Sequence, residues 1–166
     1  DVYKRQDEMT GLLNRKYFYE VLNEEFEKNK DSSLALAIIN VDDFKLYNQL
    51  YGIKEGDVCL QHIAAIIRSS VGDSGYIARY GGKEFAVLLP KYDLFSARNL
   101  VESIAKQIFV MNNRRTDMKL KAVTVSAGIS AAPYAARTVK ELMENVDLAV
   151  YHVKHSGKNG IQVFDT

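Results

Sequence analysis

The chain lacks a second cysteine, since Cys59 is the only one among its 166 residues. A disulfide within the chain is therefore excluded. Cys59 stands at helical spacing from Ile63 and Ile66, which favours a small buried side chain in a reducing compartment. The length predicts one domain that buries roughly two thirds of the surface its unfolded chain exposes, so no covalent staple is required.

The chain also lacks an excess of either charge, because 22 basic and 21 acidic residues leave a formal charge of +1. No global field recruits nucleic acid or a membrane surface, and any site for an anion must be local. No apolar run approaches the roughly 20 residues of a membrane span, and no segment resembles a signal peptide. We therefore expect a cytoplasmic location for these residues, with neither nucleic acid nor membrane among their partners.

The spacing of apolar residues predicts an alternation of helices and strands. Helices are expected over 18–26, 44–50, 58–71, 97–108 and 139–153, and strands over 34–39, 76–78, 85–89, 123–129 and 161–164. The strand at 34–39 is continuously apolar, which predicts cover on both faces and a central place in the sheet. The strand at 123–129 alternates apolar with small polar residues. This order predicts an α+β ferredoxin-like palm with a central, mostly antiparallel five-stranded sheet flanked by helices.

Two polar segments frame the expected centre of the sheet. Gly81 and Gly82 separate two strands, and we expect them to form a tight hairpin turn with positive φ. Asn40 and Asp42 share one face at the end of the central strand. In a ferredoxin-like topology that end meets the start of the strand at 85–89, so we expect Asn40 and Asp42 to lie near Lys83 and Glu84.

Several motifs together resemble the GGDEF family, the diguanylate cyclases. The resemblance covers nearly the whole chain and is carried in order by segments 7–15 (DEMTGLLNR), 42–48 (DDFKLYN), 56–57 (GD), 79–82 (RYGG), 124–129 (TVSAGI) and 151–154 (YHVK). It implies one GGDEF-like, nucleotidyl-cyclase-like domain over 7–166. Residues 1–6 look like a translated sequencing adapter, so we interpret them as a non-native or linker segment outside the fold. An upstream sensory region, through which the full-length protein could be membrane-anchored, is then absent from this sequence.

The resemblance implies an enzyme in which each subunit of a dimer holds one GTP and two GTP are condensed into cyclic di-GMP with the help of Mg²⁺. It places the metal ligands at Asn40, Lys83 and the backbone carbonyl of Val41. An amide is a weak neutral ligand and an ammonium cannot coordinate a cation, so we expect the metal site to be lost. Asp42 and Glu84 are the candidate substitutes, while Asp43 should point to the other face.

The nucleotide-binding positions are better kept than the metal positions. The resemblance assigns the guanine edge to Asn48 and Asp57, whose groups suit the donors of guanine. The other positions it assigns to the nucleotide are Phe44, Lys45, Gly81, Gly82, Lys154 and Lys158. The alternative interpretation is that these residues are solvated charges and helix caps. The inhibitory product site of many cyclases falls on Gly72 and Gly75, which offer no side chain, so we expect no such site.

We interpret the chain as a degenerate diguanylate cyclase domain of bacterial cyclic di-GMP signalling. Lys83 and Glu84 hold the catalytic signature positions but are expected to be inactive in catalysis. The domain is expected to bind GTP or a related guanine nucleotide and to act as a regulatory or dimerisation module, as a homodimer or with a partner signalling domain. No cofactor is expected. One alternative is an active or weakly active cyclase, which would need Mg²⁺, and a second is a ligand-free structural interaction domain.

Overall fold

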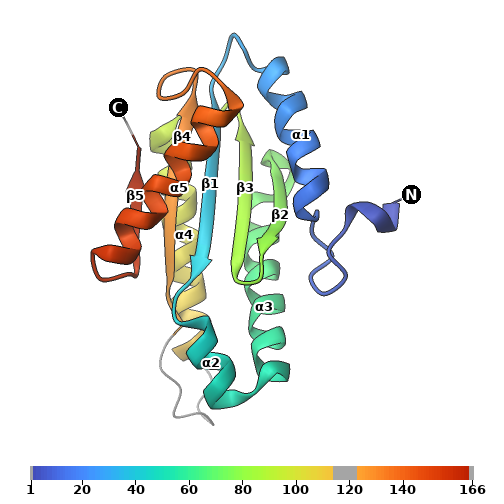
Figure 1. The fold of residues 1–166 in the computed structure, drawn as a ribbon, viewed down its shortest axis with the longest axis vertical. Coiled ribbons are helices and arrows are strands. Elements are labelled where there is room, and N and C mark those ends of the chain that lie inside the picture. The colour runs from blue at the N-terminus through green and yellow to red at the C-terminus, as the bar shows by residue number, and fades with distance from the viewer. Residues whose placement is uncertain (1, 114–122, 165–166) are drawn as a thin grey trace.

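The computed structural model describes residues 2–113 and 123–164, and its centre is a five-stranded sheet in the order β2-β3-β1-β4-β5 (Figure 1). Only the β4–β5 pair is parallel, and the other three pairs are antiparallel. The strands are β1 (Leu34–Val41), β2 (Tyr76–Gly81), β3 (Glu84–Pro90), β4 (Val125–Ala132) and β5 (Gly160–Val163). The predicted α+β architecture with a mostly antiparallel sheet is confirmed.

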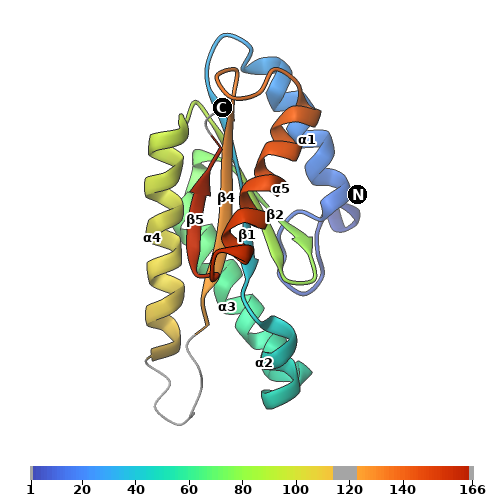
Figure 2. The same cartoon turned by 60° about the vertical axis from the view of Figure 1, so that its left-hand side comes forward.

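Helices cover both faces of this sheet (Figures 1 and 2). The α-helices are α1 (Arg15–Lys28), α2 (Phe44–Tyr51), α3 (Ile53–Val71), α4 (Leu94–Asn113) and α5 (Val139–His155), with short 3-10 helices at Val2–Arg5 and Gly72–Ser74. Helices α1 and α5 lie on one face, α3 and α4 lie on the other, and α2 follows the carboxyl end of β1 (Figure 2). None of the described helices is both long and apolar enough to cross a bilayer.

Strand β1 is the centre of the hydrophobic core, because all eight of its residues are buried. Alternate side chains point to opposite faces of a strand. Ala35, Ala37 and Ile39 pack in the cluster beneath α3 and α4, whereas Leu36 and Ile38 pack in the cluster beneath α1 and α5. The continuous apolar run therefore reflects a strand covered on both faces, as predicted.

Helices α1 and α5, which lie on the same face of the sheet, are each capped by a side chain at their start. The Asn14 side chain accepts a hydrogen bond from Tyr17 N at 2.9 Å at the start of α1. Thr138 accepts one from Glu141 N at 3.1 Å at the start of α5. Asn14 also donates from its side chain to Lys4 O, at 2.8 Å. Asn14 N donates to Arg5 O at 2.8 Å, so Lys4 and Arg5 contact the start of α1.

Two expectations about the strands are corrected. The hairpin turn is formed by Gly82 and Lys83, because Gly81 already pairs with Glu84, and neither glycine has a left-handed φ. Gly81 instead gives room to a neighbour, since a Cβ there would stand 2.8 Å from Glu84 Oε1. Strand β4 begins at Val125, two residues later than expected, and all eight of its residues are buried, including those of the small polar face.

Candidate functional site

The carboxyl end of β1 meets the β2–β3 hairpin as the sequence predicts. Asn40 pairs with Glu84 across the β1–β3 ladder, and Val41 N donates to Lys83 O at 2.9 Å. On the other side of β1, Asp42 N donates to Thr124 O at 2.9 Å, just ahead of β4. Backbone hydrogen bonds therefore hold three separate segments of the chain around one end of the central strand.

Asp42 is the most densely bonded side chain at this end. Its Oδ1 accepts from Ser126 Oγ at 2.6 Å and from Lys154 Nζ at 2.7 Å, and its Oδ2 accepts from Thr124 Oγ1 at 2.7 Å and from Asn159 N at 3.1 Å. Burial of this carboxylate alone would raise its pKa. Hydrogen bonds from Lys154, Ser126 and Thr124 outweigh that effect, so the pKa of Asp42 lies below its ordinary value.

These four bonds change the interpretation of Asp42 and of the late lysines. A carboxylate offers about four lone-pair sites, so Asp42 cannot become a metal ligand without losing one of its partners. The expectation that Asp42 substitutes for a lost ligand therefore has no support in the geometry. Lys154, predicted to bind the nucleotide, is held by Asp42, and Lys158 forms an ion pair with Asp43. Asp43 itself precedes α2 with a left-handed φ of 52°.

The residues at the family's metal positions do not fit Mg²⁺. Asn40 is buried, and its Oδ1 accepts no hydrogen bond from the residues that the structure describes. Lys83 is exposed at the hairpin tip and brings a positive charge where a hard cation would need an oxygen donor. Within residues 2–113 and 123–164, no three His, Cys, Asp or Glu side chains lie close enough to share a metal ion. At this end of β1 a metal ion would thus meet the neutral amide of Asn40, the ammonium of Lys83 and the carboxylate of Glu84.

Glu84 lies in a polar cluster that sequence reasoning did not identify. Burial and the charge of Glu84 raise the pKa of Asp147 on α5, while the positive charge of Arg15 opposes this shift. Arg15 also lies over the ring of Tyr80, 4.4 Å from its centroid. Burial and a hydrogen bond with Tyr19 raise the pKa of Tyr80. These residues come from four elements, β3, α5, α1 and β2. Arg15, Tyr80 and Glu84 belong to the motifs named above, whereas no motif indicated Tyr19 or Asp147.

The elbow between α2 and α3 brings the predicted guanine-reading residues together. Gly56 is buried beneath the Asn48 side chain, since a Cβ at Gly56 would stand 1.8 Å from Asn48 Oδ1 and 3.2 Å from Phe44 Cζ. Asn48 Oδ1 is buried and accepts no hydrogen bond from any described residue, while the adjoining Asp57 is exposed. An amide oxygen and a carboxylate, neither with a partner among the described residues, thus flank the same turn of α3.

The two glycines at the expected position of an inhibitory site have backbone roles. Gly72 ends α3 with a left-handed φ of 53°. Gly75 packs against β3, where a Cβ would stand 2.1 Å from Leu88 O. A side chain that reads a second nucleotide does not fit at Gly75 without a shift of the backbone.

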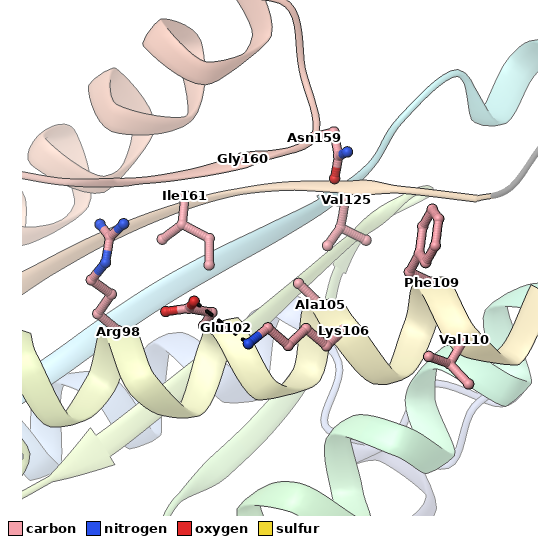
Figure 3. A pocket seen from close by; sticks show the side chains of 10 residues that line it. All are labelled: Arg98, Glu102, Ala105, Lys106, Phe109, Val110, Val125, Asn159, Gly160 and Ile161. Atoms are coloured by element: carbon pink, nitrogen blue, oxygen red, sulfur yellow. Dashed lines mark ion pairs between the residues drawn. The ribbon is translucent and has the colours of Figure 1, made fainter.

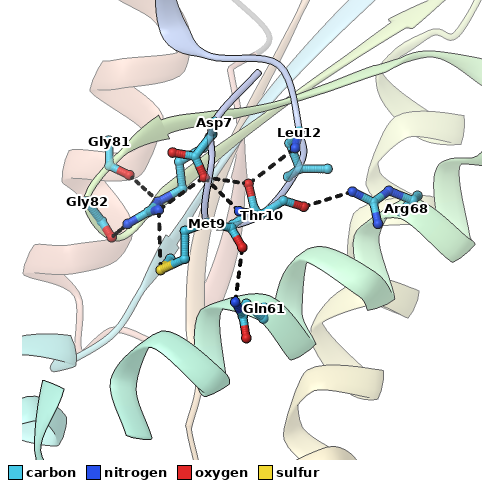
Figure 4. Close-up of polar contacts among 9 residues, drawn as sticks. Asp7, Met9, Thr10, Leu12, Gln61, Arg68, Gly81 and Gly82 are labelled. Atoms are coloured by element: carbon cyan, nitrogen blue, oxygen red, sulfur yellow. Dashed lines mark hydrogen bonds and ion pairs between the residues drawn. The ribbon is translucent and has the colours of Figure 1, made fainter. Parts of the chain in front are cut away.

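Arg79 fixes the hairpin tip to the loop before α1, and Figure 4 shows its partners Asp7, Gly81 and Gly82. Its guanidinium donates to Gly81 O at 3.0 Å and to Gly82 O at 2.8 Å, and it pairs with Asp7 Oδ2 at 3.3 Å. The same oxygen of Asp7 accepts from Thr10 N and from Thr10 Oγ1, at 3.0 and 2.7 Å. The sequence marked Arg79 only as part of a signature, and its role in holding the turn appears in the structure alone.

Comparisons with known proteins agree with this architecture. The family model described as "Diguanylate cyclase, GGDEF domain" matches residues 4–160. Diguanylate cyclase A of Treponema denticola is 32% identical over 160 residues, which is 93% of this chain and 43% of that protein. Diguanylate cyclase DgcM of Escherichia coli is 34% identical over 93% of this chain and 37% of its own length. The chain therefore spans less than half the length of these curated relatives.

A solved structure is similar throughout the domain. The GGDEF domain of DgcB from Caulobacter crescentus, crystallised with c-di-GMP, superposes with a TM-score of 0.90 at 28% identity, covering 98% of this chain and 94% of that one. Similarity of this extent includes the sheet, both helical layers and the hairpin.

Proposed function

Since the chain belongs to the GGDEF domain family of diguanylate cyclases, we propose that it is a degenerate member that binds a guanine nucleotide without condensing it to cyclic di-GMP. This proposal rests on the side chains at the end of β1, which do not suit a metal ion. Lys83 and the buried amide of Asn40 stand where metal-ligating carboxylates are expected, and Asp42 is fully bonded to its own fold. Lys83 and Glu84 then hold the signature positions without catalytic function.

Nucleotide binding would use the elbow for the base and exposed lysines for the phosphates. Asn48 and Asp57 offer an amide and a carboxylate to the guanine edge. Lys45 and Lys83 are exposed and form no ion pair with any described residue, so both are free to meet phosphate oxygens. Lys154 and Lys158 would first have to leave Asp42 and Asp43. A fixed ammonium at Lys83 thus replaces a bound cation, and nucleotide binding needs no divalent ion.

The domain would act as a regulatory or dimerising module in cyclic di-GMP signalling of a bacterial cell, in the cytoplasm. The short span of the chain relative to its curated relatives supports a larger protein with an upstream sensory region. A protein partner is a reasonable means of regulation, since the similar diguanylate cyclase SiaD of Pseudomonas aeruginosa was crystallised with its activator SiaC. SiaD superposes with a TM-score of 0.86 at 29% identity, covering 97% of this chain and 63% of that one.

A turnover assay tests the loss of catalysis. Removing one charge-stabilising contact typically lowers a rate by about 10²–10³-fold, and two ligand positions are altered here. Radiolabelled GTP with Mg²⁺ should therefore give no detectable cyclic di-GMP. Turnover at a rate comparable to an intact family member, assayed in parallel, would show that Glu84 suffices as a ligand and that the chain is an active cyclase.

Two substitutions test the assigned roles of the nucleotide site. Lys83→Ala should weaken GTP about tenfold and leave GMP nearly unchanged, because it removes a contact to the outer phosphates. Asp57→Ala should weaken both nucleotides alike, because both carry the base. Lys140→Ala, at an exposed lysine on α5, is the matched control. A chain whose melting temperature is unchanged by either nucleotide would instead be a ligand-free interaction domain.

A further inference from the structure

A groove of about 540 Å³ lies between α4 and the beginnings of β4 and β5 (Figure 3). Its walls are mostly apolar. The lining residues are Arg98, Glu102, Ala105, Lys106, Phe109, Val110, Val125, Asn159, Gly160 and Ile161. The volume falls in the range of roughly 300–1,000 Å³ that is typical of pockets for small organic ligands.

The groove lies where Ala105 of α4 faces the sheet and Gly160 begins β5, because neither residue fills the gap between helix and strand. Val125 and Ile161 point from the sheet toward α4, where Ala105 meets them with a single methyl group (Figure 3). Gly160 adds no side chain at the start of β5. Phe109, 43% exposed, forms one side of the groove with little cover of its own.

One positive charge in the groove has no partner within residues 2–113 and 123–164. Glu102 and Lys106 lie one helical turn apart on α4 and pair with each other at 3.8 Å. Arg98, one turn before Glu102, forms neither a hydrogen bond nor an ion pair with the residues that the structure describes, and its guanidinium extends from α4 toward the strands (Figure 3). The three charged side chains sum to +1, and the excess charge lies at the Arg98 end.

We propose that this groove binds a small amphipathic anion, with one carboxylate at Arg98 and an apolar chain or ring along Ala105, Ile161 and Phe109. A planar guanidinium presents two parallel N–H groups to a carboxylate, which suits it to this role. The apolar body of the ligand would cover side chains that water now contacts. This inference concerns a second ligand site and does not rest on the proposed function.

The groove is separate from the candidate nucleotide site. Asn159 lines the groove and donates from its backbone N to Asp42 Oδ2 at 3.1 Å, so the groove adjoins the end of β1. None of the residues proposed to bind the nucleotide lines the groove. One unpaired cation and a mainly apolar wall also suit a monoanion better than a nucleotide triphosphate, whose charges require several donors.

Another apolar groove, of about 320 Å³, serves as a comparison within the same chain. It is lined by Phe95 and Tyr134, which are 73% and 81% exposed, and its charged residue is Asp93. If apolar surface were sufficient, an amphipathic anion would bind in this groove as well. If charge complementarity is required, the anion binds only beside Arg98, because the Asp93 carboxylate repels it.

Calorimetric titration of the 166-residue chain with sodium decanoate, below its micelle concentration, tests the proposal. We expect saturable binding of one decanoate per chain, and binding of 1-decanol, which has the same chain length without charge, at least about tenfold weaker. Arg98→Gln should remove this preference, whereas Arg137→Gln, on the rim of a different groove, should leave it intact. Ala105→Leu should weaken both ligands because the added side chain fills the groove, and Ala65→Leu, at an exposed site on α3, is its control.

The proposal is overturned by three outcomes. Decanoate that fails to saturate shows that the groove does not hold an amphipathic anion. Equal affinity for decanoate and 1-decanol shows that Arg98 does not recognise the charge. If Ala105→Leu misfolds, judged by circular dichroism, Arg98→Gln decides alone, because it changes an exposed side chain, and unchanged selectivity in that variant contradicts the site.

Discussion

The end of β1 and the elbow between α2 and α3 differ in where their polar groups are directed. At the end of β1, Asp42 accepts four hydrogen bonds from its own chain, and two lysines are held in ion pairs. At the elbow, Asn48 Oδ1 has no described partner and Asp57 is exposed. The first region stabilises the fold with groups that could have served a metal. The second keeps polar groups that have no described partner. These groups do not stabilise the fold by themselves, since an unsatisfied buried acceptor costs about 1–3 kcal/mol.

The largest expected effect is on the free energy of unfolding, and it differs between two adjacent acidic residues at the end of β1. Asp42→Ala should lower the free energy of unfolding by about 3–5 kcal/mol, because it leaves Lys154 and two hydroxyls without their partner in a buried setting. Asp43→Ala should cost about 0–1 kcal/mol, since its ion pair with Lys158 is exposed to water. The side chains of Asp42 and Asp43 are 2% and 48% exposed. Urea denaturation measures both, and equal losses would show that Asp42 is not a structural centre.

The next largest effect is expected when carboxylates are introduced at the end of β1 so that it can bind a metal ion. Asn40→Asp together with Lys83→Asp should make GTP binding tighter in Mg²⁺ than in chelator by about tenfold or more, while neither change alone should do so. With Asn40→Asp alone the new carboxylate faces the Lys83 ammonium, and with Lys83→Asp alone the second ligand is still an amide.

The four proteins of this series form a double-mutant cycle, and the Mg²⁺ affinity gives the coupling between the two positions. Binding of Mg²⁺·GTP by the double variant no tighter than by the parent would show that the metal site was not lost at these two positions.

At the elbow, Gly56→Ala should weaken GTP by about tenfold, because the new Cβ collides with Asn48 Oδ1 and displaces the amide from the base. Elsewhere inside a helix this substitution usually stabilises the protein by about 1 kcal/mol, so a loss of affinity is not a general cost of alanine. Inosine triphosphate, which lacks the exocyclic amine, should lose less than GTP. Equal losses for both nucleotides would place the defect away from the guanine edge.

The smallest expected effect is the dependence of stability on acidic pH. The pKa of Asp42 is lowered in the folded protein, so its carboxylate contributes stability above the ordinary pKa of about 4 and loses that contribution as the pH falls below about 4. Each unit of lowering corresponds to about 1.4 kcal/mol. The difference in unfolding free energy between the parent and Asp42→Asn should therefore be constant from pH 5 to 7 and should shrink toward pH 2, as the Asp42 carboxylate becomes protonated. A difference that does not depend on pH would assign the effect to shape.

The fold could be predicted from the sequence because its signals are local. The apolar run of β1, the helical spacing on α4 and the caps at Asn14 and Thr138 each act within a few residues. The hairpin turn was placed one residue too early, because two glycines suggested the turn, whereas pairing of Gly81 with Glu84 sets its register. The alternation in β4 predicted a face of small polar residues but gave no bonding partner for them, and the structure shows that Ser126 donates to the buried Asp42.

The site could be predicted only in part, for a physical reason. Motif positions predicted that Asn40 lies beside Glu84, because a ferredoxin-like topology fixes that pairing. No pattern in the sequence indicates that Lys154 and Asn159 lie against Asp42, since those contacts join residues more than 100 positions apart. The same holds for Arg79 and Asp7, which are joined at 72 positions' separation. Hydrogen bonds across such distances depend on packing that no local pattern records.

Calorimetric titration of GTP into the chain, once with excess Mg²⁺ and once with a chelator, tests whether the domain binds the nucleotide without a metal ion. We expect saturable binding in both solutions, with dissociation constants that agree within about a factor of two, since Lys83 supplies the positive charge that a metal would otherwise bring. Binding that occurs with Mg²⁺ and is abolished by the chelator would contradict this expectation.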